Sequence, residues 1–345
     1  MKYDAILIVS FGGPEGPDDV MPFLENVLRG KNVARERMLE VAEHYYCFGG
    51  KSPINDQNRQ LIAALKVELA KYGPNLPVYL GNRNWHPMLA DTLRQMRTDG
   101  VGSALAFVTS AYSSYSSCRQ YREDIARAQA AVGEGAPSVD KIRVFHNHPR
   151  FIEALVDRVH ESLVQIPEDR RKTTPLLFTA HSIPLVMAQS CSYEEQLKEA
   201  GQLVAEALEQ ENWRLVYQSR SGPPSQPWLG PDILDALREL KNSTDSRDVV
   251  IAPIGFVSDH LEVIFDLDTQ ARELCEELGF HMVRSETVGT HPKFVAMIRE
   301  LIGERIEESR LRPALGALGP RPDVCAVDCC PMPQRPVTTK VMARE

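Results

Sequence analysis

Short apolar runs alternate with longer segments of helical periodicity along most of this chain. The runs are rich in Val, Ile and Leu, which predicts buried strands. We expect strands over Ala5–Ser10, Val78–Gly81, Ala104–Thr109, Ile142–Phe145, Leu176–Ala180, Leu215–Gln218, Val249–Ile254 and Met282–Ser285. We expect helices over segments such as Leu61–Tyr72, Met88–Arg97, Phe151–Gln165, Tyr193–Glu209, Ile233–Leu240 and His260–Leu278. This βαβα order favours parallel sheets covered by helices on both faces.

The chain length suits two doubly wound, Rossmann-like α/β domains better than one large sheet. The segment Glu134–His148 contains a Gly- and Pro-rich turn followed by an expected strand, and it marks the boundary. We therefore expect domains over residues 1–147 and 148–310, with a cleft between them. Residues 311–345 are predicted to form an irregular extension, because six prolines fall between Leu311 and Pro336. Residues 337–345 are expected to be frayed.

Composition narrows the class of protein. The 345 residues are 43% hydrophobic and 25% charged, as in ordinary globular proteins. A net charge of −8 and a pI near 5.7 argue against nucleic acid as the main partner. No apolar run approaches the roughly 20 residues needed to span a bilayer. The N-terminus lacks the layout of a signal peptide, so a cytoplasmic location is expected.

The cysteines fall into two groups. Cys47, Cys118, Cys191 and Cys275 are scattered singly, which is typical of a reducing compartment. Cys325, Cys329 and Cys330 crowd into six residues near the C-terminus. Such crowding favours a soft metal or an iron–sulfur cluster over a disulfide framework.

Polar clusters follow most of the expected strands. They include the segments 10–14, 81–87, 110–117, 179–184, 218–224 and 258–268. In parallel α/β sheets, ligands bind at the carboxyl ends of the strands, so these clusters predict one site. The dinucleotide, Walker and nucleophile-elbow motifs are absent, which disfavours dinucleotide redox, phosphoryl-transfer and esterase chemistry.

The richest cluster is Ser258–Asp268, where His260 stands among four carboxylates. Glu262 and Asp266 lie four residues apart and project from one helix face. Two carboxylates on one face are unfavourable unless they share a cation or a proton. The segment is therefore either an acidic helix N-terminus favoured by the helix dipole or a surface that handles positive charge.

His181 follows another expected strand. A neutral imidazole there could accept a proton or bind a divalent metal, or it could be a packed histidine satisfied by backbone groups. Aromatic side chains at the strand ends could line a flat slot or could simply cap the core: Phe11, Trp85, Tyr112, Tyr115 and Trp228. Other side chains could anchor carboxylates: Ser52, Arg83, Arg119, Tyr121 and Arg220.

Five motifs in order resemble the ferrochelatases, from about residue 3 to residue 305. They are Ser10–Pro14, Gly49–Ile54, Phe178–Pro184, Tyr217–Pro223 and Pro253–Glu262. The runs Ser10–Pro17 and Tyr112–Tyr121 are most similar to the actinobacterial type, which is associated with coproporphyrin III. The resemblance implies two Rossmann-like domains with a porphyrin cleft between them. It also implies a lyase of haem biosynthesis that inserts Fe²⁺ into the macrocycle.

The resemblance further implies residue roles. His181 matches the histidine that binds iron or accepts pyrrole protons, and Glu262 matches the carboxylate that completes the Fe²⁺ site. His260 matches a histidine that orients this pair, and Asp266 a carboxylate of an acidic path. Residues expected to contact the porphyrin are Ser52, Tyr121, Phe11, Arg29 and Trp228. Phe11 departs from the tyrosine or methionine found elsewhere in the family, so it offers no ligand opposite His181.

The same resemblance extends to the C-terminal cysteines. Cys325, Cys329 and Cys330 fall where some members carry ligands of a [2Fe–2S] cluster, which normally takes four thiolates. The fourth position of the animal enzymes corresponds to Ala154 here. Cys191 or Cys118 could supply the missing thiolate, or the tail could be cysteine-rich and hold no cluster.

Several alternatives stay open at this point. The porphyrin could be protoporphyrin IX, with protohaem as product, or the protein could insert cobalt or nickel into another tetrapyrrole. A two-lobed porphyrin- or haem-binding protein would need no His181–Glu262 pair. Substrate could pass by transient contact with neighbouring enzymes of the haem pathway, and the surface near Val20–Leu28 could touch a membrane or such a partner.

Overall fold

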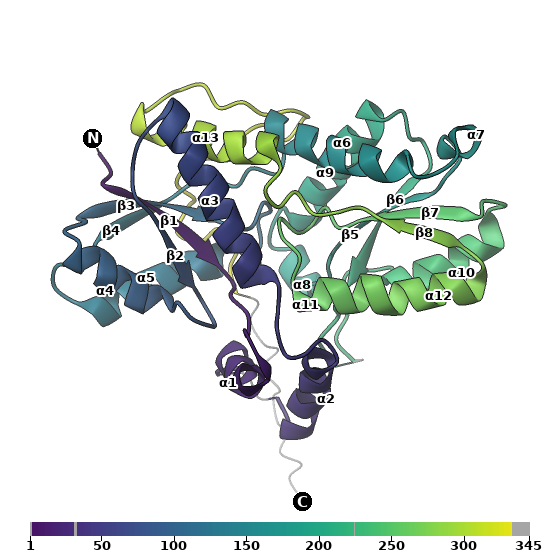
Figure 1. Ribbon diagram of the computed structural model, residues 1–345, viewed down its shortest axis with the longest axis horizontal. Coiled ribbons are helices and arrows are strands. Elements are labelled where there is room, and N and C mark those ends of the chain that lie inside the picture. The colour runs from purple at the N-terminus through teal and green to yellow at the C-terminus, as the bar shows by residue number, and fades with distance from the viewer. Residues whose placement is uncertain (1, 31–32, 224, 333–345) are drawn as a thin grey trace, which may run out of the picture.

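The chain folds about two parallel four-stranded sheets. The computed structural model describes residues 2–30, 33–223 and 225–332. In the first sheet the order is β2-β1-β3-β4, and in the second it is β6-β5-β7-β8, so both sheets repeat one pattern (Figure 1). The strands are β1 (Ala5–Ser10), β2 (Val78–Asn82), β3 (Ser103–Val108), β4 (Ser138–Lys141), β5 (Leu176–His181), β6 (Trp213–Gln218), β7 (Asp248–Ala252) and β8 (His281–Arg284). The prediction of a two-sheet α/β fold is confirmed.

The central strands form where the sequence is continuously apolar. All residues of β1 and of β7 are buried, because helices cover both faces of a parallel sheet. The fourth expected strand is wrong: residues 142–145 form no strand, and β4 lies just before them. β4 is an edge strand with a polar sequence, whereas Ile142 and Phe145, which follow it, are buried in the core.

The helices of the amino-terminal half follow the first sheet. They are α1 (Pro17–Val27), α2 (Arg35–Tyr46), α3 (Ile54–Tyr72), α4 (Leu89–Thr98), the π-helix η1 (Tyr115–Arg119) and α5 (Gln120–Val132). Those of the other half are α6 (Pro149–Leu163), α7 (Glu168–Arg171), α8 (Leu185–Ala188), α9 (Tyr193–Ala207), α10 (Ile233–Ser243), α11 (Leu261–Val263), the π-helix η2 (Ile264–Ala271), α12 (Arg272–Leu278) and α13 (Pro292–Ile306). No helix in the described part of the chain is both long and apolar enough to cross a bilayer.

One apolar core joins the two sheets. Phe107, Phe145, Phe151 and Phe294 contact one another with ring centroids 5.1 to 6.2 Å apart. α13 carries Phe294 and packs on both α3 and α6. We propose a division into one unit about each sheet, 1–147 and 148–310, with 311–345 as an extension. Residues 333–345 lie outside the described part.

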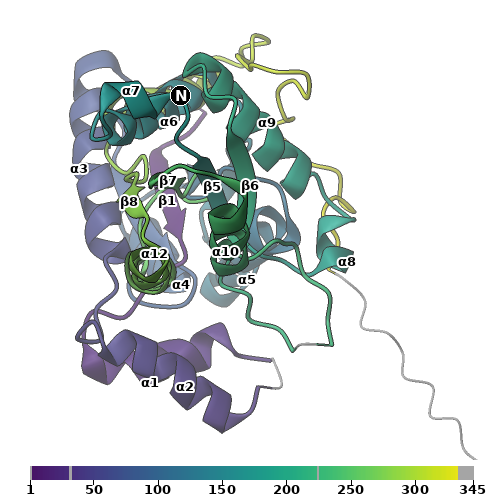
Figure 2. The same cartoon turned by 90° about the vertical axis from the view of Figure 1, so that its right-hand side faces the viewer.

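α1 and α2 project as a pair below the two sheets in Figures 1 and 2. Val20 and Phe23 of α1 and Tyr45 of α2 form a small core with Leu261. Phe11 and Trp85, from loops after β1 and β2, pack against it. This helix pair therefore contacts the start of α11 in the other half of the molecule.

Candidate active site

The candidate pair lies at the carboxyl ends of neighbouring strands. His181 is the last residue of β5, and Glu262 follows β7 in α11. Because the chain runs from β5 to β6 on one side and returns to β7 on the other, strand order reverses between β5 and β7. Ligands in open α/β sheets bind at such a reversal point. The fold thus brings together two residues that lie far apart in the sequence.

His181 and Glu262 face each other across an accessible gap. Nε2 of His181 lies 3.6 Å from Oε2 of Glu262, and the two side chains are 34% and 44% exposed. Nδ1 of His181 lies 2.5 Å from the carbonyl oxygen of Ser182. A carbonyl can only accept, so Nδ1 carries the hydrogen and donates it. This contact leaves the lone pair of Nε2 directed at the gap, available to a proton or a metal.

The pair is tuned to hold positive charge. Burial lowers the pKa of His181, but the Glu262 carboxylate and the Ser182 carbonyl outweigh it, so that the pKa lies above its usual value. A proton, or a cation competing for the same lone pair, is therefore stabilised between the two side chains. The functional interpretation of this histidine stays a prediction.

Asp266 stands behind the pair, on η2. Gln218 Nε2 donates to Asp266 Oδ2 at 3.2 Å, and the Ser219 hydroxyl donates to the same oxygen. Thr179 in turn donates to Gln218 Oε1 at 2.8 Å, so the ends of β5 and β6 hold Asp266 in place. Burial raises the pKa of Asp266 to about 6, and Glu262 adds to the rise. The carboxyl can therefore exchange a proton near neutral pH.

The helix after β7 departs from the expected regular helix. Its residues 264–271 are π-helical, and such turns are frequent at functional sites. His260 caps the helix, since its Nδ1 accepts the N–H of Val263 at 3.3 Å. Burial lowers the pKa of His260, which keeps the imidazole neutral and able to cap. His260 is thus placed to orient the turn that carries Glu262.

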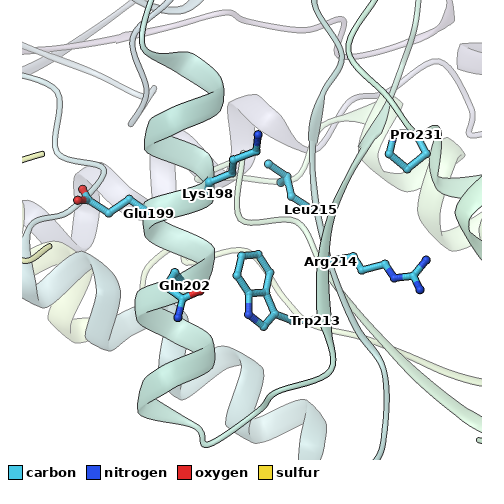
Figure 3. Close-up of a pocket in the computed structure, with 7 residues that line it drawn as sticks. All are labelled: Lys198, Glu199, Gln202, Trp213, Arg214, Leu215 and Pro231. Atoms are coloured by element: carbon cyan, nitrogen blue, oxygen red, sulfur yellow. The ribbon is translucent and has the colours of Figure 1, made fainter. Parts of the chain in front are cut away.

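A hollow of about 290 Å³ lies against the acidic side of the site. Its lining includes Glu262 and Asp266 together with His44 of α2. A larger hollow of about 730 Å³ lies elsewhere, on the outer side of β6. Figure 3 shows Trp213 there beside Lys198 and Gln202 of α9, with no member of the candidate site among the residues drawn. The volume of a hollow alone therefore does not identify the candidate site.

Two of the expected porphyrin contacts meet at one arginine. The Arg83 guanidinium lies 4.6 Å from the ring centre of Tyr121 and 5.7 Å from that of Phe11. Arg83 also pairs with Asp124, which is largely buried. Tyr121 itself is buried in the core of the first sheet. Phe11 and Tyr121 therefore both lie against one guanidinium.

The other three expected contacts have different partners. Ser52 is buried, and its N–H donates to the Pro14 carbonyl at 2.9 Å. Arg29 is exposed just after α1 and donates to the Asn26 side chain. Trp228 is bridged to Pro184, in the loop that follows His181. Its indole N–H is buried without a hydrogen-bond partner among the described residues.

Two residues considered for ligand contacts have structural roles instead. Tyr112 is buried in the core and donates to the Ile254 carbonyl at 2.9 Å, which links the two sheets. Arg119 donates to Glu123 at 2.9 Å and to the Cys329 carbonyl at 3.0 Å. The core-capping interpretation is therefore right for Tyr112.

Some contacts at the site had no sequence signal. His44 of α2 stacks on Phe265 of η2, with ring centroids 3.9 Å apart. The N–H of Asp259 donates to Gln57 Oε1, on α3, at 2.8 Å. In both contacts the partners come from different halves of the chain, so no local pattern could reveal them.

The C-terminal cysteines approach one of the two proposed partners. An interaction between the thiols of Cys118 and Cys325 raises the pKa of Cys118, and burial adds to this rise. The same interaction lowers the pKa of Cys325, although burial opposes it. Cys325 also contacts Cys329, whereas the Cys191 thiol donates to the Met187 carbonyl at 3.1 Å. As the side chains stand, no group of three or more His, Cys, Asp or Glu in the described residues can hold a metal ion.

Solved structures share this fold. SirB from Bacillus subtilis with Fe³⁺ matches with a TM-score of 0.55 at 12% identity, over 88% of this chain and 97% of that one. CbiX, described as the terminal enzyme of sirohaem biosynthesis in denitrifying bacteria, matches with a TM-score of 0.51 at 15% identity, over 87% and 98%. At such identities the likeness concerns the fold alone.

Sequence comparisons identify the family. The ferrochelatase family model matches residues 3–306. A ferrochelatase of Rhodopirellula baltica is 60% identical over 97% of this chain and 95% of that protein. A coproporphyrin III ferrochelatase of Streptomyces griseus is 50% identical over 95% and 93%. The His181–Glu262 pair and its strand-end loops lie within the matched region, and the chain belongs to the ferrochelatase family.

Proposed function

We propose that this protein inserts Fe²⁺ into coproporphyrin III and forms Fe–coproporphyrin III in haem biosynthesis. The proposal rests on one observation: Nε2 of His181 faces Oε2 of Glu262 where the strand order of the second sheet reverses. Family membership supports the reaction type, and the names of relatives such as that of Streptomyces griseus support the porphyrin.

The reaction exchanges one Fe²⁺ for two protons on the pyrrole nitrogens. The lone pair at Nε2 of His181 can take one proton as the nitrogen releases it, and the charge of Glu262 stabilises the resulting imidazolium. Asp266, with a pKa of about 6, is suited to receive a proton from this pair and pass it towards the adjoining hollow. Fe²⁺ is a substrate here, and the same two side chains would bind it on its way to the ring.

The direct test is anaerobic Fe²⁺ insertion with coproporphyrin III and protoporphyrin IX side by side. We expect a higher kcat/KM for coproporphyrin III, which carries propionates where protoporphyrin IX has vinyl groups. A preference for protoporphyrin IX would overturn the choice of substrate. Tight binding of both porphyrins without metal uptake would instead support a porphyrin-binding protein. Co²⁺ and Ni²⁺ in parallel reactions test the metal.

We also propose that Cys118, rather than Cys191, joins Cys325, Cys329 and Cys330 as a ligand of a [2Fe–2S] cluster. The placement of the thiols supports this. Cys118 interacts with Cys325, and Cys325 interacts with Cys329. Arg119 donates to the carbonyl of Cys329, and Arg122 donates to that of Cys325. Four thiolates are what such a cluster takes. A bound cluster would tie the C-terminal segment to η1.

For the cluster we predict that Cys118→Ser removes the visible absorption and the paramagnetic signal of the reduced protein. Cys191→Ser is the matched control and should keep both, because the Cys191 thiol is already bonded to the Met187 carbonyl. Iron and sulfide analysis of anaerobic preparations measures loading independently of activity. Colourless, iron-free wild-type protein would refute the cluster, and a fully loaded Cys118→Ser variant would refute the ligand.

We further propose that the protein works in the cytoplasm and meets neighbouring enzymes of the haem pathway transiently. All seven cysteines are free thiols, as a reducing compartment favours. Exposed apolar side chains on the projecting helix pair, such as Leu39 and Tyr46 of α2, support a contact surface there.

A further inference from the structure

One arginine neutralises half of the acidic cluster beside the site. Arg284, the last residue of β8, donates Nε and Nη2 to the two carboxylate oxygens of Asp268, each at 2.9 Å. Its Nη1 donates to Asp259 Oδ1 at 3.0 Å. All three side chains are mostly buried, with exposures of 14% for Arg284, 14% for Asp259 and 24% for Asp268. Asp268 is therefore an ion-paired residue and not a solvated one.

The position of Arg284 follows from strand register. β8 pairs with β7 so that Arg284 lies beside Ile251, near the end of the strand that leads into the active-site loop. Asp259 precedes α11, and Asp268 lies within η2. The guanidinium thus bridges two points of one segment, and Glu262 lies between them in the sequence. A planar fork of donors can hold two carboxylates in this way, whereas an ammonium cannot do so with the same geometry.

The ion pairs of Arg284 divide the four carboxylates of this segment into two kinds. Burial lowers the pKa of Arg284, but Asp259 and Asp268 outweigh it, so the guanidinium stays charged. Arg272 also approaches Asp268, at 3.6 Å, from the exposed side. Four carboxylates within ten residues would repel one another if none were paired. Asp259 and Asp268 pair with Arg284, whereas Glu262 and Asp266 line the hollow of about 290 Å³.

The other end of the segment is fixed independently of Arg284. The Asp259 N–H donates to Gln57 of α3 at 2.8 Å, and His260 caps α11. These contacts hold the entry to the helix, while Arg284 connects that entry to η2. Loss of Arg284 should therefore loosen η2 against the loop without detaching the segment.

We propose that Arg284 is a positioning residue for the iron site: by clamping Asp259 and Asp268 it holds Glu262 opposite His181. This inference rests on the proposed function. Its expected signature is a loss of kcat and of Fe²⁺ affinity with unchanged use of the porphyrin. Displacing a reacting group by about 1 Å can cost on the order of a hundredfold in rate.

The test compares Arg284→Met with Arg284→Lys. We expect Arg284→Met to lower kcat at least about tenfold and raise the KM for Fe²⁺, with the KM for porphyrin within about twofold. Arg284→Lys should recover part of kcat, since one ammonium can still pair one carboxylate. The matched control is Arg299→Met, because Arg299 also pairs with two carboxylates, Glu68 and Glu300, but lies on α13.

The outcomes separate the clamp from the proposed function. Wild-type protein that inserts no iron refutes the function. If the wild type is active, either of two results refutes the clamp. In the first, the kinetic constants of Arg284→Met equal those of Arg299→Met. In the second, the constants of Arg284→Met for Fe²⁺ and for porphyrin change by the same factor. If thermal melting and circular dichroism show that Arg284→Met is unfolded, the same kinetic constants are measured for Asp268→Asn. That variant keeps the Arg284–Asp259 pair and should show a smaller change of the same kind.

Discussion

Replacement of His181 by alanine is expected to abolish iron insertion while the protein remains folded. The variant loses the imidazole whose Nε2 faces Glu262 across the gap. Loss of a group that both accepts a proton and binds the metal should lower kcat by at least about 10³-fold. The side chain is 34% exposed, so its removal leaves no sealed core cavity. The lost bond to the Ser182 carbonyl should cost about 1 kcal/mol of stability.

The measurement is anaerobic turnover with Fe²⁺ and coproporphyrin III, beside thermal melting of the same preparations. His281→Ala is a suitable control, because His281 also pairs with a carboxylate, Asp248, at 3.0 Å. His281 is the first residue of β8, at the amino end of that strand, whereas the site lies at the carboxyl ends of β5 and β7. We expect full activity in that control. Near-normal turnover by folded His181→Ala would remove His181 from the mechanism.

Replacement of Glu262 by glutamine should lower kcat about 10² to 10³-fold, and replacement of Asp266 by asparagine about tenfold. Glu262 faces Nε2 of His181 directly, whereas Asp266 is held behind it by Gln218 and Ser219. Both substitutions keep side-chain size and remove charge. Equal losses in the two variants would contradict the separate roles.

The pH dependence distinguishes Asp266 further. Its pKa of about 6 lies above the ordinary value of 3.8, so a base role requires pH above about 6. We expect the acid limb of the kcat profile to change in Asp266→Asn. A group with a raised folded-state pKa stabilises the fold while protonated, and that stability is lost as pH rises through about 6. Asp266→Asn should therefore melt at a higher temperature than wild type at pH 8. An unchanged profile and an unchanged melting temperature would refute this role.

Much of the fold can be predicted from local patterns in the sequence. The apolar runs of β1, β3, β5 and β7 predict buried parallel strands, because a strand covered on both faces must be apolar throughout. The loops that follow them carry side chains that are costly to place away from a ligand or partner. The edge of the sheet that bears the candidate site could therefore be predicted from the sequence, and the roles of His181, Glu262 and Asp266 there stay predictions.

Other features depend on partners distant in the chain. β4 is polar and forms because β3 offers hydrogen bonds, while the apolar residues after it enter a core shared with α13. The burial of Tyr112 likewise depends on packing between the two halves, and His44 of α2 stacks on Phe265 of the π-helical turn. No periodicity within a short window records these contacts.

The sequence by itself determined that an acidic turn and a histidine stand at strand ends, since residue type and local pattern are written in it. Only the tertiary structure decided which carboxylates pair with Arg284. Asp259 and Asp268 are paired by Arg284 from β8, and Glu262 is left facing His181 at 3.6 Å. The physical reason is that charge is compensated through space, and the cation that compensates this turn reaches it from a strand whose place is set by sheet register.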